Sequence, residues 1–190
     1  MSKTYKGDVT GNVVELNLLD ANEGTLPNLG TPTVVTRSTG VRDVTQVVGD
    51  ITSTSGFYFD NDVQGLVIGT SCTSIGSDAF YSCFDLNGPL IIPNSVTSIG
   101  QNSFLFCSSL DLLVIPESVT NIEGFAFLSC SQLTAVYTNT PASSFTGTEA
   151  LQGTTFTTIY TGPNATGYTS SFQGRTGLTI SAWTNYPNIP

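Results

Sequence analysis

The stretch Leu90–Gly100 reads Leu-Ile-Ile-Pro-Asn-Ser-Val-Thr-Ser-Ile-Gly. Its short apolar groups suit β-strands, and Pro93 and Gly100 mark points where a strand ends or the chain bends. The same order of residues recurs 23 positions later, from Leu113 to Ile122, and a more divergent copy begins 24 positions earlier at Leu66. The stretch is therefore one unit of an internal repeat.

Each unit continues through a second set of fixed positions, in which a phenylalanine is followed three residues later by a cysteine and then by a leucine. A period of roughly 20 to 29 residues with Leu and Ile at constant positions is typical of a solenoid of stacked coils. We expect the repeated apolar positions to form its core. The predicted core residues are Ile75, Phe80, Cys83, Ile99, Phe104, Cys107, Ile122, Phe127 and Cys130.

The repeat extends in both directions when positions are counted in steps of 23. Residues 136–158 form a fourth, degenerate coil, and residues 159–161 are expected to be a closing strand. Towards the N-terminus, Phe57 and Val63 fall on the apolar positions of the repeat, which predicts a degenerate first coil over about residues 43–65. Atypical terminal coils are expected, because they turn one face to water.

This pattern resembles the BspA-type leucine-rich repeat over about residues 66–161. Residues 92–100 match the Ile-Pro, Ser-Val-Thr-Ser-Ile-Gly half of that repeat, and residues 126–130 match its Ala-Phe and Cys half. Gly69 departs from it, since the family has proline there. The family is a binding and adhesion scaffold of bacterial surfaces, some protists, phages and other viruses. The resemblance therefore implies an interaction module and no chemistry.

These observations predict a mainly β fold, a leucine-rich-repeat solenoid of about four coils of 23–24 residues with an N-terminal β appendage. Short 3₁₀ or helical turns are expected at the Ala-Phe positions. Residues 1–42 are predicted to be a docking or anchor segment, with a strand at Thr33–Thr36. Residues 43–174 are the solenoid with its capping coils, and residues 175–190 are a C-terminal tail.

Composition and charge exclude several functions. The 190 residues include no His, which excludes Ser-His-Asp triads, Cys-His pairs and His metal sites. Residues 43–174 hold ten acidic side chains and no Lys or Arg, in a chain of net charge −9. Such a surface repels nucleic acid and anionic membranes. No apolar run reaches the roughly 20 residues of a membrane span, and the N-terminus lacks the pattern of a Sec signal peptide.

The four cysteines are the first candidate site. Cys83, Cys107 and Cys130 share one position of the repeat, and Cys72 occupies another inward position. We expect free, buried thiols, because side chains in register point the same way and a bridge between them would be strained. A disulfide and a metal site are the alternatives, and no C-x2-C pair supports the metal site.

The polar candidates point to surface roles. Residues 60–65 begin like an EF-hand calcium loop but have Ser71 at position twelve, where a bidentate Glu is needed, so a polar turn is expected. Asn164 begins a glycosylation sequon. The acidic side chains fall in different repeat positions and make no evident glycosidase pair. They are Asp78, Asp85, Asp111, Glu117 and Glu123.

The sequence therefore predicts a non-enzymatic structural or binding protein without cofactor or metal. The first hypothesis is a phage virion component, a capsid decoration or a tail-associated protein. It would contact other virion proteins through residues 1–42 and the C-terminal tail, and a host surface receptor through the solenoid. The alternative is an adhesin on the bacterial cell surface. Sequence alone does not identify the residues of the binding surface.

Overall fold

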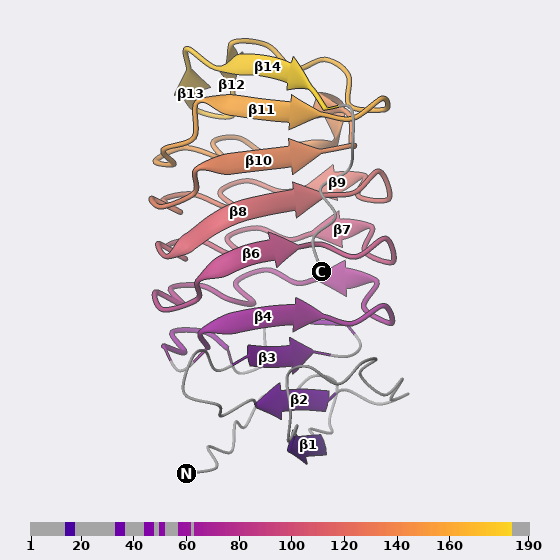
Figure 1. Ribbon diagram of the computed structural model, residues 1–190, viewed down its shortest axis with the longest axis vertical. Coiled ribbons are helices and arrows are strands. Elements are labelled where there is room, and N and C mark those ends of the chain that lie inside the picture. Colours follow the sequence, from indigo (N-terminus) through magenta and orange to yellow (C-terminus); the bar gives the residue numbers. More distant parts are fainter. Residues whose placement is uncertain are drawn as a thin grey trace.

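The computed structural model describes residues 50–51, 57–61 and 63–183, together with the backbone of three strands nearer the N-terminus. These strands are β1 (Val14–Asn17), β2 (Thr33–Thr36) and β3 (Val44–Val47). Figure 1 shows the strands rising as one stack from β1 to β14. The chain forms a mainly β solenoid of about five turns, which confirms the predicted fold class.

Long strands form one side of the stack. They are β4 (Gly65–Ile68), β6 (Gly88–Ile91), β8 (Leu110–Ile115), β10 (Ala135–Thr138), β11 (Thr158–Thr161) and β14 (Thr179–Ala182). The last five make a parallel sheet in the order β14-β11-β10-β8-β6. Leu113 pairs with Val136, and Val136 with Ile159, so the sheet keeps the 23-residue step of the sequence.

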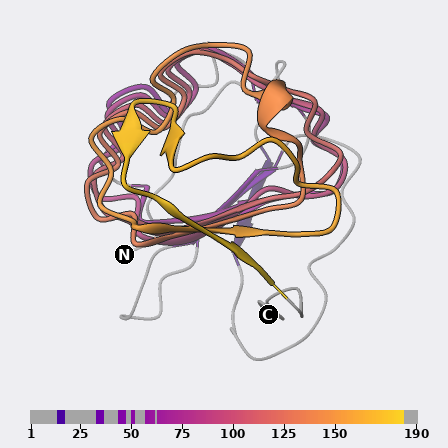
Figure 2. The same cartoon turned by 90° about the horizontal axis from the view of Figure 1, so that it is seen from above.

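Short strands form a second parallel sheet. They are β5 (Ser74–Ile75), β7 (Ser98–Ile99) and β9 (Asn121–Ile122), paired in the order β5-β7-β9. The remaining elements are the 3₁₀ helix η1 (Ala142–Ser144) and the hairpin of β12 (Ser171–Phe172) and β13 (Arg175–Thr176). Seen down the stack, the coils superimpose and the long strands make one flat side (Figure 2).

Tight turns end the long strands. The Val96 amide donates to the Pro93 carbonyl at 3.0 Å, and proline suits this position because it has no N–H to leave unpaired in the ladder. In the preceding coil the Cys72 amide donates to the Gly69 carbonyl at 3.1 Å. Gly69 therefore preserves the turn although it departs from the family pattern.

The Ala-Phe segments form short consecutive turns, in which an N–H donates to the carbonyl three residues earlier as in the 3₁₀ turns expected, but no continuous helix. Tyr81 N–H donates to the Asp78 carbonyl at 3.2 Å and Cys83 N–H to the Phe80 carbonyl at 3.3 Å. Asp78 and Ser82 have φ values of 58°, in the left-handed region, which prevents a continuous right-handed helix. Within the described residues the 3₁₀ helix lies elsewhere, at η1.

The phenylalanine column is the centre of the core. The rings of Phe57, Phe80, Phe104 and Phe127 stack with centroids 5.0, 5.1 and 5.4 Å apart and interplanar angles of 18°, 8° and 6°. Backbone bonds accompany the rings, since Phe80 N–H donates to the Ser103 carbonyl at 2.7 Å in the next coil. All nine predicted core residues are buried.

Cys83, Cys107 and Cys130 form a second column beside the rings. All four cysteines are free and buried. Each thiol of the column donates to the carbonyl of a phenylalanine in the preceding coil: Cys83 to Phe57 at 2.9 Å, Cys107 to Phe80 at 3.1 Å and Cys130 to Phe104 at 3.3 Å. The thiol protons thus have hydrogen-bond acceptors in a core that water does not reach.

The N-terminal end of the stack contains the predicted degenerate first coil. β3 pairs in parallel with β4, with Val44 opposite Gly65, and Phe57 stacks on Phe80. β2 pairs antiparallel with β3 and parallel with β1, so both strands continue the sheet beyond the repeat. The rest of the predicted docking segment lies outside the described residues.

At the other end, the prediction that residues 159–161 close the stack is wrong. β14, which was assigned to the tail, pairs with β11 in parallel, with Ile159 opposite Ile180. The hairpin caps the backbone of the coil below, where the Gln173 side chain accepts from Ala150 N–H at 3.0 Å and donates to the Gly147 carbonyl at 3.0 Å. Arg175 donates to the Phe156 carbonyl at 2.6 Å. Residues 184–190 lie outside the described residues.

Replacing Phe104 with Ala removes a ring that contacts rings in two neighbouring coils. The substitution should lower the free energy of unfolding by about 3 to 5 kcal/mol, through lost burial and the cavity left behind. Phe84→Ala removes a ring that is 41% exposed and is the control, with a change of less than about 0.5 kcal/mol. A melting temperature of Phe104→Ala within a degree or two of wild type would contradict the repeat alignment.

The thiols should be unreactive in the folded protein. Burial raises the pKa of Cys72 and of Cys130 to about 12, so little thiolate is available at pH 8. A thiol reagent should label native protein slowly and label all four cysteines after unfolding without reductant. Fewer than four labels after unfolding would reveal a disulfide, and rapid labelling of native protein would contradict the burial.

Candidate interaction surface

Every second side chain of the long strands points out of the sheet, away from the core. Ile91, Val114, Tyr137 and Tyr160 lie opposite one another in successive strands and form what we call the outward row. Their neighbours along each strand point into the core. Ile91, Tyr137 and Tyr160 are half-buried, and Val114 is buried.

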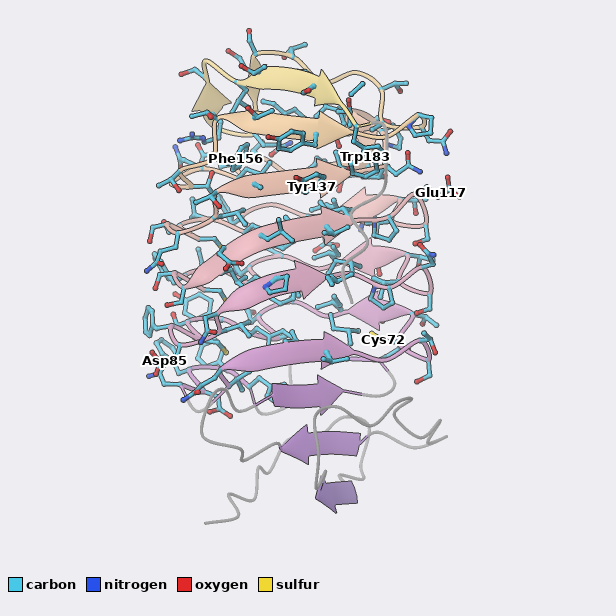
Figure 3. All side chains as sticks on the ribbon, in the orientation of Figure 1. Cys72, Asp85, Glu117, Tyr137, Phe156 and Trp183 are labelled. Atoms are coloured by element: carbon cyan, nitrogen blue, oxygen red, sulfur yellow. The ribbon has the colours of Figure 1, made fainter. Side chains whose placement is uncertain are left out.

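Three aromatic rings lie together at the C-terminal end of this row. Tyr137 and Tyr160 stack with centroids 4.6 Å apart at 12°, and Trp183 stacks on Tyr137 at 5.7 Å and 25°. We call these residues the aromatic stack. The register of β10 and β11 places one tyrosine over the other at the strand spacing of about 4.8 Å. Figure 3 shows Tyr137 on the sheet and Trp183 towards the ends of the strands.

Gly162 allows the aromatic stack to form. A Cβ at this position would lie 2.4 Å from Asn139 Oδ1 and 2.7 Å from Trp183 Cζ2. The backbone after β11 therefore passes close beneath the indole. The backbone N–H of Trp183 donates to the Thr161 carbonyl at 3.1 Å. A larger residue at Gly162 would displace Trp183 or Asn139.

A polar corner adjoins the aromatic stack where the strands end. Glu117 Oε2 accepts from the side-chain amides of Asn139, at 3.3 Å, and of Asn164. Asn139 Oδ1 accepts from the Asn164 backbone N–H at 3.0 Å. These three residues are the polar corner. Beside them lies an open hollow of about 260 Å³, lined by Asn94, Pro116, Glu117 and Asn139.

This arrangement has the chemical groups that recognition of a ligand requires. Ordered rings supply contact area, and the adjoining amides and carboxylate supply hydrogen-bonding groups. In the described part of the chain no three His, Cys, Asp or Glu side chains are placed to hold a metal ion. Nor do the described residues include a helix long and apolar enough to span a membrane.

The other acidic candidates lie apart from one another. Asp78 accepts from the Asn102 side-chain amide at 3.0 Å, and Glu123 accepts from Gln101 N–H at 3.0 Å, so both join neighbouring coils. Asp85 and Asp111 are exposed. Of the predicted candidates, the structure places Glu117 and Asn164 together in the polar corner.

The segment that begins like a calcium loop forms a turn that leads into β4. Asn61 Oδ1 accepts from Phe84 N–H at 3.2 Å, Val63 is buried, and Gly65 begins the strand. These contacts hold the turn against the next coil. Asp62 lies outside the described residues.

The aromatic stack and Asn139 were not identified by sequence analysis. The 23-residue spacing of Tyr137 and Tyr160 was a usable signal, because it places both at one position of consecutive coils. Trp183 gave no such signal, since it follows an irregular cap that breaks the repeat. Asn139 gave none either, because its partner Glu117 lies in another coil.

The chain was compared with known proteins and protein families. Among curated proteins none matches the chain. A solved structure, a leucine-rich repeat protein from Bacteroides ovatus, aligns with 82% of this chain at 17% identity and a TM-score of 0.37. The chain spans 37% of that protein's length. Residues 51–179 match the BspA type leucine rich repeat region in six copies. The family and its fold are typically those of non-catalytic binding scaffolds. The chain thus belongs to the BspA-type leucine-rich repeat family.

Proposed function

We propose that this protein is a non-enzymatic binding protein and a phage virion component, either a capsid decoration or a tail-associated protein. Its solenoid would be displayed for attachment to a host surface receptor. The observation that carries the proposal is the aromatic stack beside the polar corner, because both lie outside the buried core.

The aromatic stack is suited to binding because its rings are already ordered. Tyr137 and Tyr160 support each other at 4.6 Å, so a partner would immobilise few side chains on binding. Tyr and Trp are also the residues that most often dominate binding energy at interfaces. The polar corner beside them offers amide groups and the Glu117 carboxylate to a partner's hydrogen-bond donors and acceptors.

Charge supports a division of roles along the chain. Residues 1–42 carry four acidic and four basic side chains, whereas residues 43–174 carry ten acidic and no basic ones. A neutral segment docks on a large assembly more easily than an acidic surface does. Strands β1 and β2 already extend a sheet, and strand addition is a common docking mode. Residues 1–42 and the C-terminal tail would therefore contact other virion proteins, with the solenoid facing outward.

The absence of catalysis is part of the proposal. The carboxylates of Asp78 and Glu123 accept hydrogen bonds that join coils, and that of Glu117 accepts from two asparagines. None of these acids is paired with another acid or with a nucleophile at hydrogen-bond distance in the described structure. Such a set holds the solenoid together and binds ligands, and it offers no acid–base couple.

The binding role predicts a loss of attachment when the aromatic stack is removed. Particles that carry Tyr137→Ser with Tyr160→Ser should adsorb to host cells at least tenfold more slowly, as expected for interface hot spots. Tyr137→Phe with Tyr160→Phe keeps the rings and should adsorb nearly normally. Val67→Ser, on the outer face of β4, is the matched control. Normal adsorption of the serine variant, with an unchanged melting temperature, would refute the role of the stack.

The virion role predicts that residues 1–42 are needed for assembly. Deleting them should abolish incorporation into particles, measured by mass spectrometry of purified virions, while circular dichroism shows the repeats still folded. Unfolded repeats would mean that the segment only caps the first coil. A folded, truncated protein that still enters particles would contradict both roles. Recovery of the full chain on bacterial cells and not in particles would favour the adhesin.

A further inference from the structure

A second aromatic cluster lies in the turns that precede the long strands. Tyr58 stacks on Tyr81 at 4.9 Å, Phe59 lies 4.7 Å from Tyr58 and 5.3 Å from Tyr81, and Phe106 contacts Tyr81 edge-on at 6.0 Å. We call these four residues the corner cluster. Tyr58, Phe59 and Phe106 are 51%, 53% and 38% exposed. Four touching rings at the surface exceed the scattered apolar residues that a soluble protein ordinarily exposes.

Backbone conformation makes these phenylalanines unusual. Phe59 and Phe106 have φ values of 56° and 63°, in the left-handed region that bulky side chains avoid. The equivalent residues of the coil between them and of the coil that follows are Ser82 and Ser129, with φ values of 58° and 60°. The fold therefore requires a left-handed residue here but does not require an aromatic ring. Neither local preference nor burial accounts for the two rings, which points to a role at the surface.

The charge around the corner cluster limits what can cover it. Asp85 is exposed and lies at the side of the stack where β4 and β6 begin (Figure 3). Residues 43–174 offer no positive charge. A second copy docking through its own residues 43–174, an anionic membrane or a nucleic acid would each bring like charges together. A partner with positive charge among apolar side chains is complementary.

We propose that the corner cluster binds a partner protein that presents arginine side chains. Guanidinium groups would lie against the exposed rings of Tyr58, Phe59 and Phe106, and the Asp85 carboxylate would pair with one of them. Arginine fits better than lysine, because its planar group stacks on aromatic faces and binds carboxylates with two parallel hydrogen bonds. This surface is separate from the aromatic stack on the sheet.

The test uses the full chain and a labelled synthetic peptide of alternating arginine and leucine. A second peptide carries citrulline in place of arginine, which keeps the shape and removes the charge. The arginine peptide should bind at least tenfold more tightly, and its affinity should fall as salt rises from 50 to about 300 mM. The double variant Phe59→Ser with Phe106→Ser should bind the peptide roughly tenfold more weakly, because each ring–cation contact contributes about two- to fivefold to the affinity.

Serine is suitable for this variant because the same left-handed position already holds serine in two coils. Asp85→Asn should weaken binding a few-fold and reduce its salt dependence. Val67→Ser, on the outer face of β4 and in neither aromatic group, is the control and should change the affinity less than twofold. Equal binding of both peptides, or unchanged affinity of the serine variant, would overturn the proposal. The proposal would also be overturned if the chain did not bind the arginine peptide and the corner cluster were needed instead for self-association or for binding to phosphatidylglycerol vesicles.

Discussion

The stacking of Phe57, Phe80, Phe104 and Phe127 fixes the spacing of the coils, and the rest of the structure depends on it. Parallel rings about 5 Å apart fit together only when every coil places its phenylalanine at the same height and angle. That spacing is also the distance between hydrogen-bonded strands, so the rings and the two parallel sheets reinforce one another. Close approach then demands a glycine at Gly100, where a Cβ would lie 2.5 Å from Ser77 N.

The same constraint leaves no room for function inside the solenoid. Rings, aliphatic side chains and thiols fill the interior, and even Cys83, Cys107 and Cys130 are occupied in hydrogen bonds to carbonyls of the preceding coil. Binding must therefore use residues that vary without disturbing the spacing. Such residues lie in the outward row and in the turns before the long strands. The aromatic stack and the corner cluster occupy these two places.

Much of this architecture could be predicted from the sequence because the repeat is strict between Leu66 and Leu133. A fixed step determines which residues stack, so Phe104 could be placed in the core without knowledge of the fold. The cap could not be predicted, because Gln173 and Arg175 act on coils about 20 residues earlier through side chains that follow no period. The polar corner was missed for the same reason, since the partner of Glu117 is Asn164, two coils away.

The account rests on the claim that backbone hydrogen bonds between coils run unbroken along the phenylalanine column. Amide hydrogen exchange measured by NMR tests it directly at Phe80, Phe104 and Phe127, whose N–H groups donate to Ser103, Ala126 and Ala150 in the next coil. These three amides should be among the slowest to exchange and should share one opening free energy, close to that of global unfolding. Exchange as fast as that of exposed turn residues, or three unrelated opening free energies, would contradict a single stacked core.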